Sequence, residues 1–404
     1  MPPSDPQTIM DLERDYLLQT YNRYPLALSK GKGCHLYDLA GRRYLDFLTG
    51  IGVNALGHAH PRITKILREQ AGLLIHSSNL YYHEYQGPLA KRLVEMSGLT
   101  RAFFCNSGTE AVEGAIKMMH SHGRAINAEK YEIVALENSF HGRSVGALSV
   151  TGQPKYRQDF EPLMPGVKFL PVNDIAALEA AFSDRTAGII MELIQGEGGI
   201  NPVSREFAAR ARELCDRHNA LLVADETQCG VGRPGTYFAY QRSTPMVMPD
   251  VVVAAKPVAC GLPLGFILTN DKAAGTIKPG MHGTTFGGGP LACRVSLEFL
   301  TLLDELLPTI QRVGGYFHVK LNELAAKHAI VKEVRGFGLM LGMELSIPGK
   351  QMVLDGMNEG LLFNCTHDYV LRFLPPYIAT EKEVDQAIKI LGKVLGKAKP
   401  VDAQ

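Results

Sequence analysis

The sequence has almost no net charge and contains no long apolar run. Its 404 residues include 42 Lys and Arg against 41 Asp and Glu, so no excess of positive charge attracts nucleic acid or an anionic membrane surface. No stretch has 18 consecutive apolar residues, and the first residues, MPPSDPQTIMDLERDY, lack an apolar core of signal-peptide length. We therefore expect a soluble, cytoplasmic protein whose partners are small molecules, with no nucleic acid and no membrane among them.

The cysteines lack the spacing of a zinc site or of a disulfide framework. They occur singly along the chain, without a CxxC pair and without a neighbouring histidine cluster, at Cys34, Cys105, Cys215, Cys229, Cys260, Cys293 and Cys365. An odd number of scattered cysteines is typical of a reduced cytosolic protein. We expect no structural zinc and no other bound metal.

From about residue 100 onwards, short apolar runs alternate with helical patterns. The runs are RAFFCN, YEIVALEN, AGIIMELIQ, ALLVADE, DVVVAA and LGFILTN, and the helical patterns between them include TEAVEGAIKMMHSHG and REFAARARELCDRHNA. Strands that are apolar on both faces are typical of a mostly parallel sheet covered by helices on both sides. We predict a large α/β domain over residues 61–299, which also contains the helical patterns ITKILREQAGLLIH and PLAKRLVEM.

The two ends of the chain have a different pattern. HLYDLAG and RRYLDFLTG predict a hairpin near the N-terminus. Towards the C-terminus we expect two helices, Leu291 to Leu303 and Thr309 to Lys327, then strands in VKEVRGFGLMLGMEL and YVLRF, and a last helix in TEKEVDQAIKILGKVLG. We predict that residues 1–60 and 300–404 together form a smaller α+β domain.

Polar residues follow five of the apolar runs, in the segments CNSGTE, ENSFHGR, ELIQGEGG and DETQ and at Lys256. Ligands of such sheets bind at the carboxyl ends of the strands. Any one of these segments can be explained as a strand end that reaches water. Because the residue types are selective in all five, the set favours a binding site.

The NSGTEA segment follows a strand and opens a helix. Free N–H groups of a first helical turn attract a phosphate, and the hydroxyls of Ser107 and Thr109 flank Gly108 as further donors. The alternative is simple helix capping, for which Ser and Thr are ordinary residues. The segment matches neither GxGxxG nor GxxxxGK[ST], so nothing in it supports nicotinamide or nucleoside triphosphate binding.

Asp225 and Lys256 each end an apolar run, where an isolated charge is costly. Asp225 can serve as a turn or cap residue, and a lone lysine can extend its ammonium to water. Together with a phosphate-binding helix start, the two residues form a consistent site for pyridoxal 5′-phosphate. In such a site a lysine amine forms a Schiff base, an acid holds the ring nitrogen protonated, and burial favours the free amine. Phe140 could cover one ring face or belong to the core.

Beyond these residues, the chain resembles the class III (subgroup II) pyridoxal-phosphate aminotransferases, and most of all their acetylornithine aminotransferase branch. Motifs in the family's order run over nearly the full length: YPLALSKGKGCHLYDLAGRRYLDFLTGIGVNALGHAHP, SSNLYYHEYQGPLAKRL, FFCNSGTEAVEGAIKM, ENSFHGRSVGALSVTGQPKY, IQGEGGI, LLVADETQCGVGRPG, the lysine segment, HGTTFGGGPLAC and LRFLPPYIATEKEVDQAI. The resemblance implies the fold type I of pyridoxal-phosphate transferases. It also implies a homodimer with its sites at the interface.

The resemblance also implies a role for each site residue. Lys256 is the Schiff-base lysine and Asp225 pairs with the pyridine nitrogen. The other cofactor contacts implied are the ring hydroxyl for Gln228, the ring face for Phe140, the phosphate for Ser107, Gly108 and Thr109, and the partner subunit's phosphate for Thr285.

Two arginines are implied to bind substrate carboxylates, for which the planar guanidinium is suited. Arg143 resembles the residue that binds the distal carboxylate, and Arg372 the residue that binds the α-carboxylate of glutamate. Glu197 is implied to pair with Arg372 and to release it when glutamate binds. From the residues alone, Arg143 could equally be a surface arginine and Arg372 a member of a strand-end ion pair.

Three positions depart from the family's pattern. Pro257 replaces a residue of a glycine-rich segment and cannot donate a backbone N–H, and Gly289 replaces an asparagine. Ile51 stands where ornithine aminotransferases have a tyrosine that contacts the substrate, and an apolar residue suits an acylated substrate better.

The implied activity is transfer of the terminal amino group of N2-acetyl-L-ornithine to 2-oxoglutarate, a step of arginine biosynthesis. Alternatives within the class are succinylornithine, ornithine, 4-aminobutyrate or an acylated lysine as donor. Alternatives outside it are a non-catalytic cofactor-binding homologue and an NAD-type oxidoreductase, against which the lack of a GxGxxG turn counts.

Overall fold

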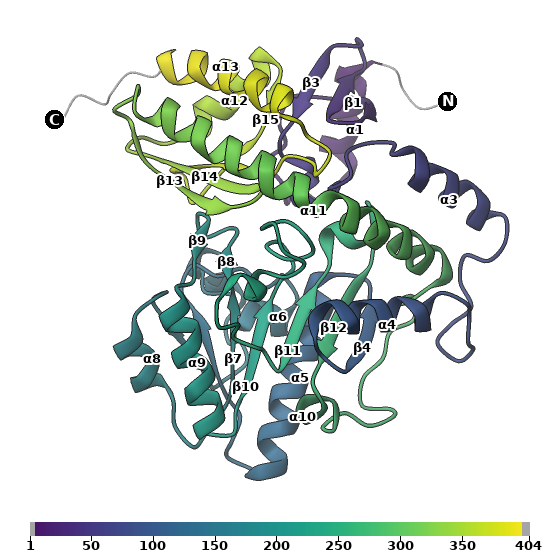
Figure 1. Cartoon of the computed structure of the whole chain (residues 1–404), viewed down its shortest axis with the longest axis vertical. Helices are drawn as coiled ribbons and strands as arrows, with labels where there is room; N and C mark the ends of the chain where they lie inside the picture. Colours follow the sequence, from purple (N-terminus) through teal and green to yellow (C-terminus); the bar gives the residue numbers. More distant parts are fainter. Residues whose placement is uncertain (1–4, 398–404) are drawn as a thin grey trace.

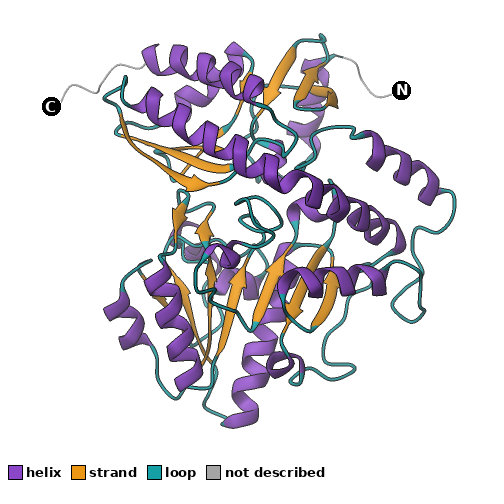
Figure 2. Cartoon of the chain, in the orientation of Figure 1, coloured by secondary structure: helices purple, strands orange, loops and turns teal. Residues whose placement is uncertain are grey.

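A seven-stranded sheet forms the centre of the computed structural model, which describes residues 5–397 (Figures 1 and 2). The strand order is β4-β12-β11-β10-β7-β5-β6, and β12 runs antiparallel to both of its neighbours while the other pairs are parallel. The strands are β4 (Arg101–Cys105), β5 (Glu132–Leu136), β6 (Val167–Leu170), β7 (Thr186–Glu192), β10 (Leu221–Asp225), β11 (Val251–Ala254) and β12 (Gly265–Thr269). The predicted α/β fold with a mostly parallel sheet is confirmed, and β6 is a strand that the sequence reading did not include.

Consecutive residues of the central strands point into two separate hydrophobic cores. Ile133 packs with helix α5 (Gly108–Ile126) on one face, whereas its neighbour Val134 packs with helices α8 (Ile175–Ala181) and α9 (Arg205–Arg217) on the other. Because side chains alternate along a strand, a sheet covered on both faces needs apolar residues at every position. This requirement explains the continuous apolar runs. The end of each run therefore marks the end of a strand at the edge of the sheet.

Two smaller sheets lie at the other end of the molecule, and one of them combines both ends of the chain. In the first, strand β15 (Leu361–Leu362) pairs in parallel with β3 (Arg43–Asp46), so a C-terminal segment extends an N-terminal sheet (Figure 1). The remaining strands of this sheet are β1 (Leu28–Lys32) and β2 (His35–Asp38). This pairing agrees with a smaller domain built from both ends, whose boundaries at residues 60 and 300 stay a prediction.

The second of these, which we call the C-terminal sheet, has the order β13-β14-β17-β16. Its strands are β13 (Val331–Phe337), β14 (Met340–Leu345), β16 (Asn364–Thr366) and β17 (Val370–Phe373), and the helices beside it are α12 (Lys350–Glu359) and α13 (Glu381–Lys397). The strands and last helix predicted from VKEVRGFGLMLGMEL, YVLRF and TEKEVDQAIKILGKVLG are confirmed.

The predicted pair of helices after residue 290 is wrong, because α11 (Pro290–Ala325) is one continuous helix with Pro308 inside it. A proline removes one backbone hydrogen bond and favours a break. Here buried side chains on both sides of the proline, among them Phe299 and Phe317, belong to the same core. Their packing keeps the helix continuous, and α11 runs diagonally across the molecule with its second half packed on the C-terminal sheet (Figure 1).

The predicted helix ITKILREQAGLLIH ends earlier than expected. Helix α3 (Pro61–Ala71) starts at its proline and stops before Leu73, Leu74 and Ile75, which are all exposed. The remaining elements are α1 (Pro6–Tyr16), α2 (Thr49–Gly52), α4 (Gln86–Ser97), α6 (Val145–Ser149), α7 (Pro154–Arg157), α10 (Asp271–Ala274), β8 (Ile194–Gln195), β9 (Asn201–Pro202) and the 3₁₀ turns η1 (Gln158–Phe160), η2 (Ala239–Arg242) and η3 (Lys256–Ala259). Among residues 5–397, no helix is both long and apolar enough to cross a membrane.

Candidate active site

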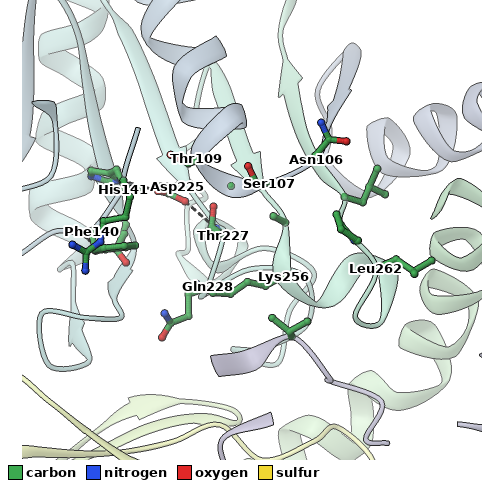
Figure 3. A pocket seen from close by; sticks show the side chains of 18 of the residues that line it. Asn106, Ser107, Thr109, Phe140, His141, Asp225, Thr227, Gln228, Lys256 and Leu262 are labelled. Carbon is green, nitrogen blue, oxygen red and sulfur yellow. Dashed lines mark hydrogen bonds and ion pairs between the residues drawn. The ribbon is translucent and has the colours of Figure 1, made fainter. Parts of the chain in front are cut away.

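The five segments that follow the predicted strands meet at one edge of the large sheet. They surround a cavity of about 420 Å³, a size typical of small-molecule sites (Figure 3). The predicted residues that line it are Ser107, Gly108, Thr109, Phe140, Arg143, Asp225, Gln228 and Lys256. Three others, Glu197, Arg372 and Thr285, are not among the residues that line this cavity.

Helix α5 begins at the cavity with an open first turn. Ser107 is extended and accepts a hydrogen bond from the N–H of Glu110 at 3.3 Å, so it is the N-cap residue that the capping alternative predicts. The N–H groups of Gly108 and Thr109 belong to the first turn, where no intrahelical acceptor exists. A Cβ on Gly108 would lie 2.6 Å from the Thr227 side chain, which explains the glycine. The helix start can therefore bind an anion as well as being capped.

Asp225 ends β10 with its carboxylate held from two sides. One oxygen accepts the N–H of Thr227 at 3.0 Å, and the other lies 2.7 Å from Nδ1 of His141 (Figure 3). A carboxylate can only accept, so Nδ1 donates this bond. The turn alternative for Asp225 is thus correct for one oxygen. His141, which sequence reasoning missed although it follows Phe140 directly, fixes the other.

Glu192 is a second buried acid that sequence reasoning did not single out. Its carboxylate accepts the N–H groups of Phe140 and Gly196, each at 3.0 Å, and so joins the segments after β5 and β7. Burial raises its pKa to about 7, against the opposing effect of nearby His141. Its place as the first residue of ELIQGEGG, at the end of a buried strand, was the available signal.

Lys256 follows β11 in a strained backbone conformation. Its φ of +41° lies in the left-handed region, which is unfavourable for a residue with a Cβ, and such strain concentrates at functional sites. Burial lowers the pKa of its amine, Glu197 opposes that shift, and Arg372 adds to it. The side chain faces the cavity, so the alternative of a lysine that only extends to water is not favoured.

Pro257, the departure beside this lysine, fits the local structure. It occupies the first turn of η3, where a missing N–H leaves no hydrogen bond unmade. Gly289 caps α11 with a φ of −62°, a value that any residue can adopt. The turn after Lys256 is a short 3₁₀ turn, whose residues Val258 and Ala259 are buried.

The buried Arg372 and the partly exposed Glu197 form an ion pair at the side of the cavity. Nη1 of Arg372 lies 2.5 Å from the Glu197 carboxylate and 3.0 Å from Oε1 of Gln228, and Nε donates to Asn364 at 3.1 Å. Burial alone would raise the pKa of Glu197, but the charge and the hydrogen bond of Arg372 outweigh it and lower that pKa. Among residues 5–397, Nη2 of Arg372 has no hydrogen-bond partner. The pairing predicted by the resemblance is present, in a strand-end position as the alternative also predicted.

Arg143 and Thr285 are the exposed members of the predicted set. The Arg143 guanidinium lies 3.9 Å from the centre of the Tyr156 ring at the cavity mouth, so it is a surface arginine that also faces the cavity. Thr285 is exposed and does not reach the cavity of its own chain. Ile51 lies in the left-handed turn of α2 and is 38% exposed, and Val53 lines the cavity in its place.

Comparison with known proteins agrees with this geometry. Residues 16–395 match the family described as aminotransferase class-III. The chain belongs to this family. An acetylornithine aminotransferase of Methanocaldococcus jannaschii is 46% identical over 96% of this chain and 98% of its own length, and one of Aquifex aeolicus is 46% identical over 94% and 100%.

Solved structures of aminotransferases have the same fold. An ornithine aminotransferase from Toxoplasma gondii ME49 has a TM-score of 0.92 at 32% identity, covering 98% of this chain and 96% of that one. An acetylornithine aminotransferase from Elizabethkingia anophelis has a TM-score of 0.86 at 29% identity, covering 98% and 100%. The predicted class III membership and fold type I are confirmed.

Class-III aminotransferases use pyridoxal phosphate, and the residues of this aminotransferase fit that cofactor. The open first turn of α5 offers donors for a phosphate, and the buried carboxylate of Asp225 offers an acceptor for a ring N–H. The lowered pKa of Lys256 favours the uncharged amine that an aldehyde requires. All three features face the same cavity.

Proposed function

We propose that this aminotransferase transfers the terminal amino group of N2-acetyl-L-ornithine to 2-oxoglutarate, giving N-acetyl-L-glutamate 5-semialdehyde and L-glutamate. The observation that carries the proposal is the buried Arg372 paired with Glu197, whose charges both act on Lys256. The names of the relatives, at 41 to 46% identity, support the acetylated donor. Location in the cytoplasm stays a prediction.

Lys256 and Asp225 have the proposed catalytic roles in the site. When bound, pyridoxal phosphate withdraws electrons from the substrate carbon that carries the amine and so makes its C–H acidic. Lys256 would hold the cofactor covalently at rest, and its free amine, whose pKa is lowered, would move the proton from that carbon. Asp225 holds the ring N–H, with its orientation fixed by His141 and Thr227.

The other proposed cofactor contacts divide between ring and phosphate. Gln228 contacts the ring hydroxyl and Phe140 one face of the ring, and both line the cavity. Ser107, Gly108 and Thr109, at the open turn of α5, would hold the phosphate.

Two arginines would let one cavity accept two kinds of amine. Arg143, at the mouth, binds the carboxylate that lies far from the reacting amine in acetylornithine and in glutamate. Arg372 binds the α-carboxylate of glutamate, for which its unpartnered Nη2 is available within the described residues. With acetylornithine, no carboxylate lies near the reacting amine, and Glu197 neutralises Arg372 instead. The preference for an acylated donor inferred from Ile51 stays a prediction of the resemblance, because Val53 lines the cavity in its place.

We further propose a homodimer. The segment 73–82 is largely apolar yet exposed, with Leu80 at 85% and Tyr82 at 105% exposure, as expected of a surface that another protein covers. Asn79 in this segment donates to the carbonyl of Gly287 at 3.0 Å, which places the segment beside the loop that carries Thr285. This neighbourhood supports the role of Thr285 at the partner subunit's phosphate.

The dimer is tested by molar mass and by complementation. We expect light scattering to give twice the 44.2 kDa of the chain. A hybrid dimer pairs a Lys256→Ala subunit, which keeps Thr285, with a Thr285→Ala subunit, which keeps Lys256. If Thr285 acts across the interface, the site of the second subunit contains both intact residues. If Thr285 acts within its own subunit, neither site contains both. Hybrids that bind cofactor no better than the Thr285→Ala dimer would argue against that role.

The substrate is tested with a panel of ω-amines and 2-oxoglutarate, scored by the glutamate formed. The panel contains N2-acetylornithine, succinylornithine, ornithine, 4-aminobutyrate and an acetylated lysine. We expect preference for acetylornithine, and equal or faster turnover of free ornithine would refute the choice. A protein that binds the cofactor but forms no glutamate with any amine would be the non-catalytic homologue.

Separate measurement of the two half-reactions distinguishes the role of Arg143 from that of Arg372. We expect Arg143→Ala to lose activity with both acetylornithine and glutamate, and Arg372→Ala to lose it mainly with glutamate. Arg217→Ala, an exposed arginine at the end of α9, is the matched control. Equal losses for Arg372→Ala in the two half-reactions would argue against the proposal that the α-carboxylate of glutamate replaces Glu197 as the partner of Arg372.

A further inference from the structure

The loop that carries Glu197 is held by side chains of the C-terminal sheet. The hydroxyl of Thr366, on β16, donates to the backbone carbonyl of Glu197 itself at 2.5 Å. Arg335, on β13, donates through Nε and Nη2 to the carbonyl of Gly199 at 2.9 and 2.7 Å. These contacts fix the backbone of the loop on both sides of Gly198, and none of them involves the Glu197 side chain.

The strand β16 contacts both members of the ion pair. Asn364 accepts from Nε of Arg372 at 3.1 Å, and Thr366, two residues later, donates to the Glu197 backbone. Residues two apart on a strand point to the same side. Asn364 lies directly opposite Arg372 in the pairing of β16 with β17, which determines where along β16 the guanidinium lies. One short strand therefore sets the position of the arginine relative to the acid.

The anchors are themselves well fixed. Thr366 is 5% exposed, so its hydroxyl has little access to water as an alternative partner. Arg335 is held by Glu344 at 2.5 Å and Glu333 at 2.9 Å, which leaves its remaining donors directed at Gly199. Gly199 adopts a φ of +109°, which a residue with a side chain rarely adopts. The loop therefore has a defined backbone shape that the anchors can maintain.

We propose that Thr366 and Arg335 are positioning residues that determine how well Glu197 neutralises Arg372, and through this the preference between the two amine substrates. The inference rests on the proposed function, since it concerns the same ion pair. With the anchors in place, exchange of Glu197 for a substrate carboxylate needs only side-chain rotation. Without them, the loop moves and the acid no longer meets the guanidinium. Acetylornithine then reacts beside an uncompensated charge, whereas glutamate supplies its own carboxylate.

Thr366→Val in the holoenzyme tests this inference, because valine keeps the shape and removes the hydroxyl. Each half-reaction is followed separately by the change in cofactor absorbance in single turnovers, with acetylornithine and with glutamate. Loss of one hydrogen bond of ordinary strength predicts a fall of about fivefold in kcat/KM for acetylornithine. We expect kcat/KM for glutamate to be unchanged or raised. Thr366→Ser, which restores the hydroxyl, should behave as the wild type.

Arg335→Lys repeats the test at the second anchor, where it keeps the charge and removes the two-pronged contact with Gly199. The same selective loss is expected. A merely structural role would lower both half-reactions together, so equal losses or no loss in either would overturn the inference. If the wild type itself does not turn over acetylornithine, the proposed function is wrong. A wild type that is active while the variants show no selectivity refutes only the role of the anchors.

Discussion

His141→Leu is the substitution that most sharply tests how the site holds its buried acid. The His141 ring is fully buried and donates to Asp225 at 2.7 Å, and the only other donor recorded for that carboxylate within the described residues is the N–H of Thr227. Leucine fills a similar volume without a donor. One oxygen of a carboxylate that is 2% exposed is then left without its partner.

Loss of a hydrogen bond to a buried charged group costs roughly 1.5–3 kcal/mol. For a chain of 404 residues, whose unfolding entropy scales with its length, that corresponds to a fall of roughly 2–4 °C in Tm. Because Asp225 serves both amine substrates, we also expect kcat/KM to fall by about tenfold, equal to 1.4 kcal/mol, in each half-reaction. Thermal scanning of the apoprotein and single turnovers of the holoenzyme measure the two effects separately.

His141→Asn is the matched control, since its amide nitrogen can occupy the place of Nδ1. We expect it to regain most of the lost Tm and activity. If His141→Leu unfolds at the wild-type temperature and reacts at wild-type rates, the His141 contact does not orient Asp225 and the reasoning fails. A loss confined to one half-reaction would also contradict it.

Two further substitutions test the surroundings of the site. Glu226 is buried, and burial raises its pKa to about 7. Its protonated form therefore contributes about 3 kcal/mol of stability below its ordinary pKa, and this contribution is lost as pH rises through 7. The Tm of Glu226→Gln should rise relative to that of the wild type between pH 5 and pH 8, and parallel curves of Tm against pH would contradict this. Asp46 accepts the N–H groups of Leu48 and Thr49 and faces His58 at 2.8 Å, and it precedes a turn, residues 49–52, in which every φ is positive. Asp46→Ala should lower the free energy of unfolding by roughly 2–4 kcal/mol, measured in urea, and an unchanged midpoint would show that the turn is stable without it.

The strand ends were predictable because the buried sheet imposes a strong pattern. Continuous apolar runs mark strands covered on both faces, and the residue that ends each run lies at a known edge. Lys256 and Asp225 were found in this way, and both line the cavity. The carboxyl ends of neighbouring parallel strands must meet, so the meeting of these segments followed from the fold class.

Contacts between distant segments were not predictable in the same way. The partner of Asp225 is 84 residues away, and that pairing depends on which loops cross the strand ends. The anchors of Glu197 lie on strands of another sheet, far along the chain, and a threonine and an arginine on strands carry no signal of their own. The continuity of α11 across Pro308 likewise came from tertiary packing, which outweighs the local preference.

Borohydride reduction and peptide mapping show whether the cavity at the strand ends binds its cofactor through Lys256. Purified protein supplied with pyridoxal phosphate is reduced and digested, and the peptides are analysed by mass spectrometry. We expect one modified peptide, with the reduced cofactor on Lys256, and no modification of that peptide in Lys256→Ala. Modification at another lysine, or none after cofactor is added, would contradict it.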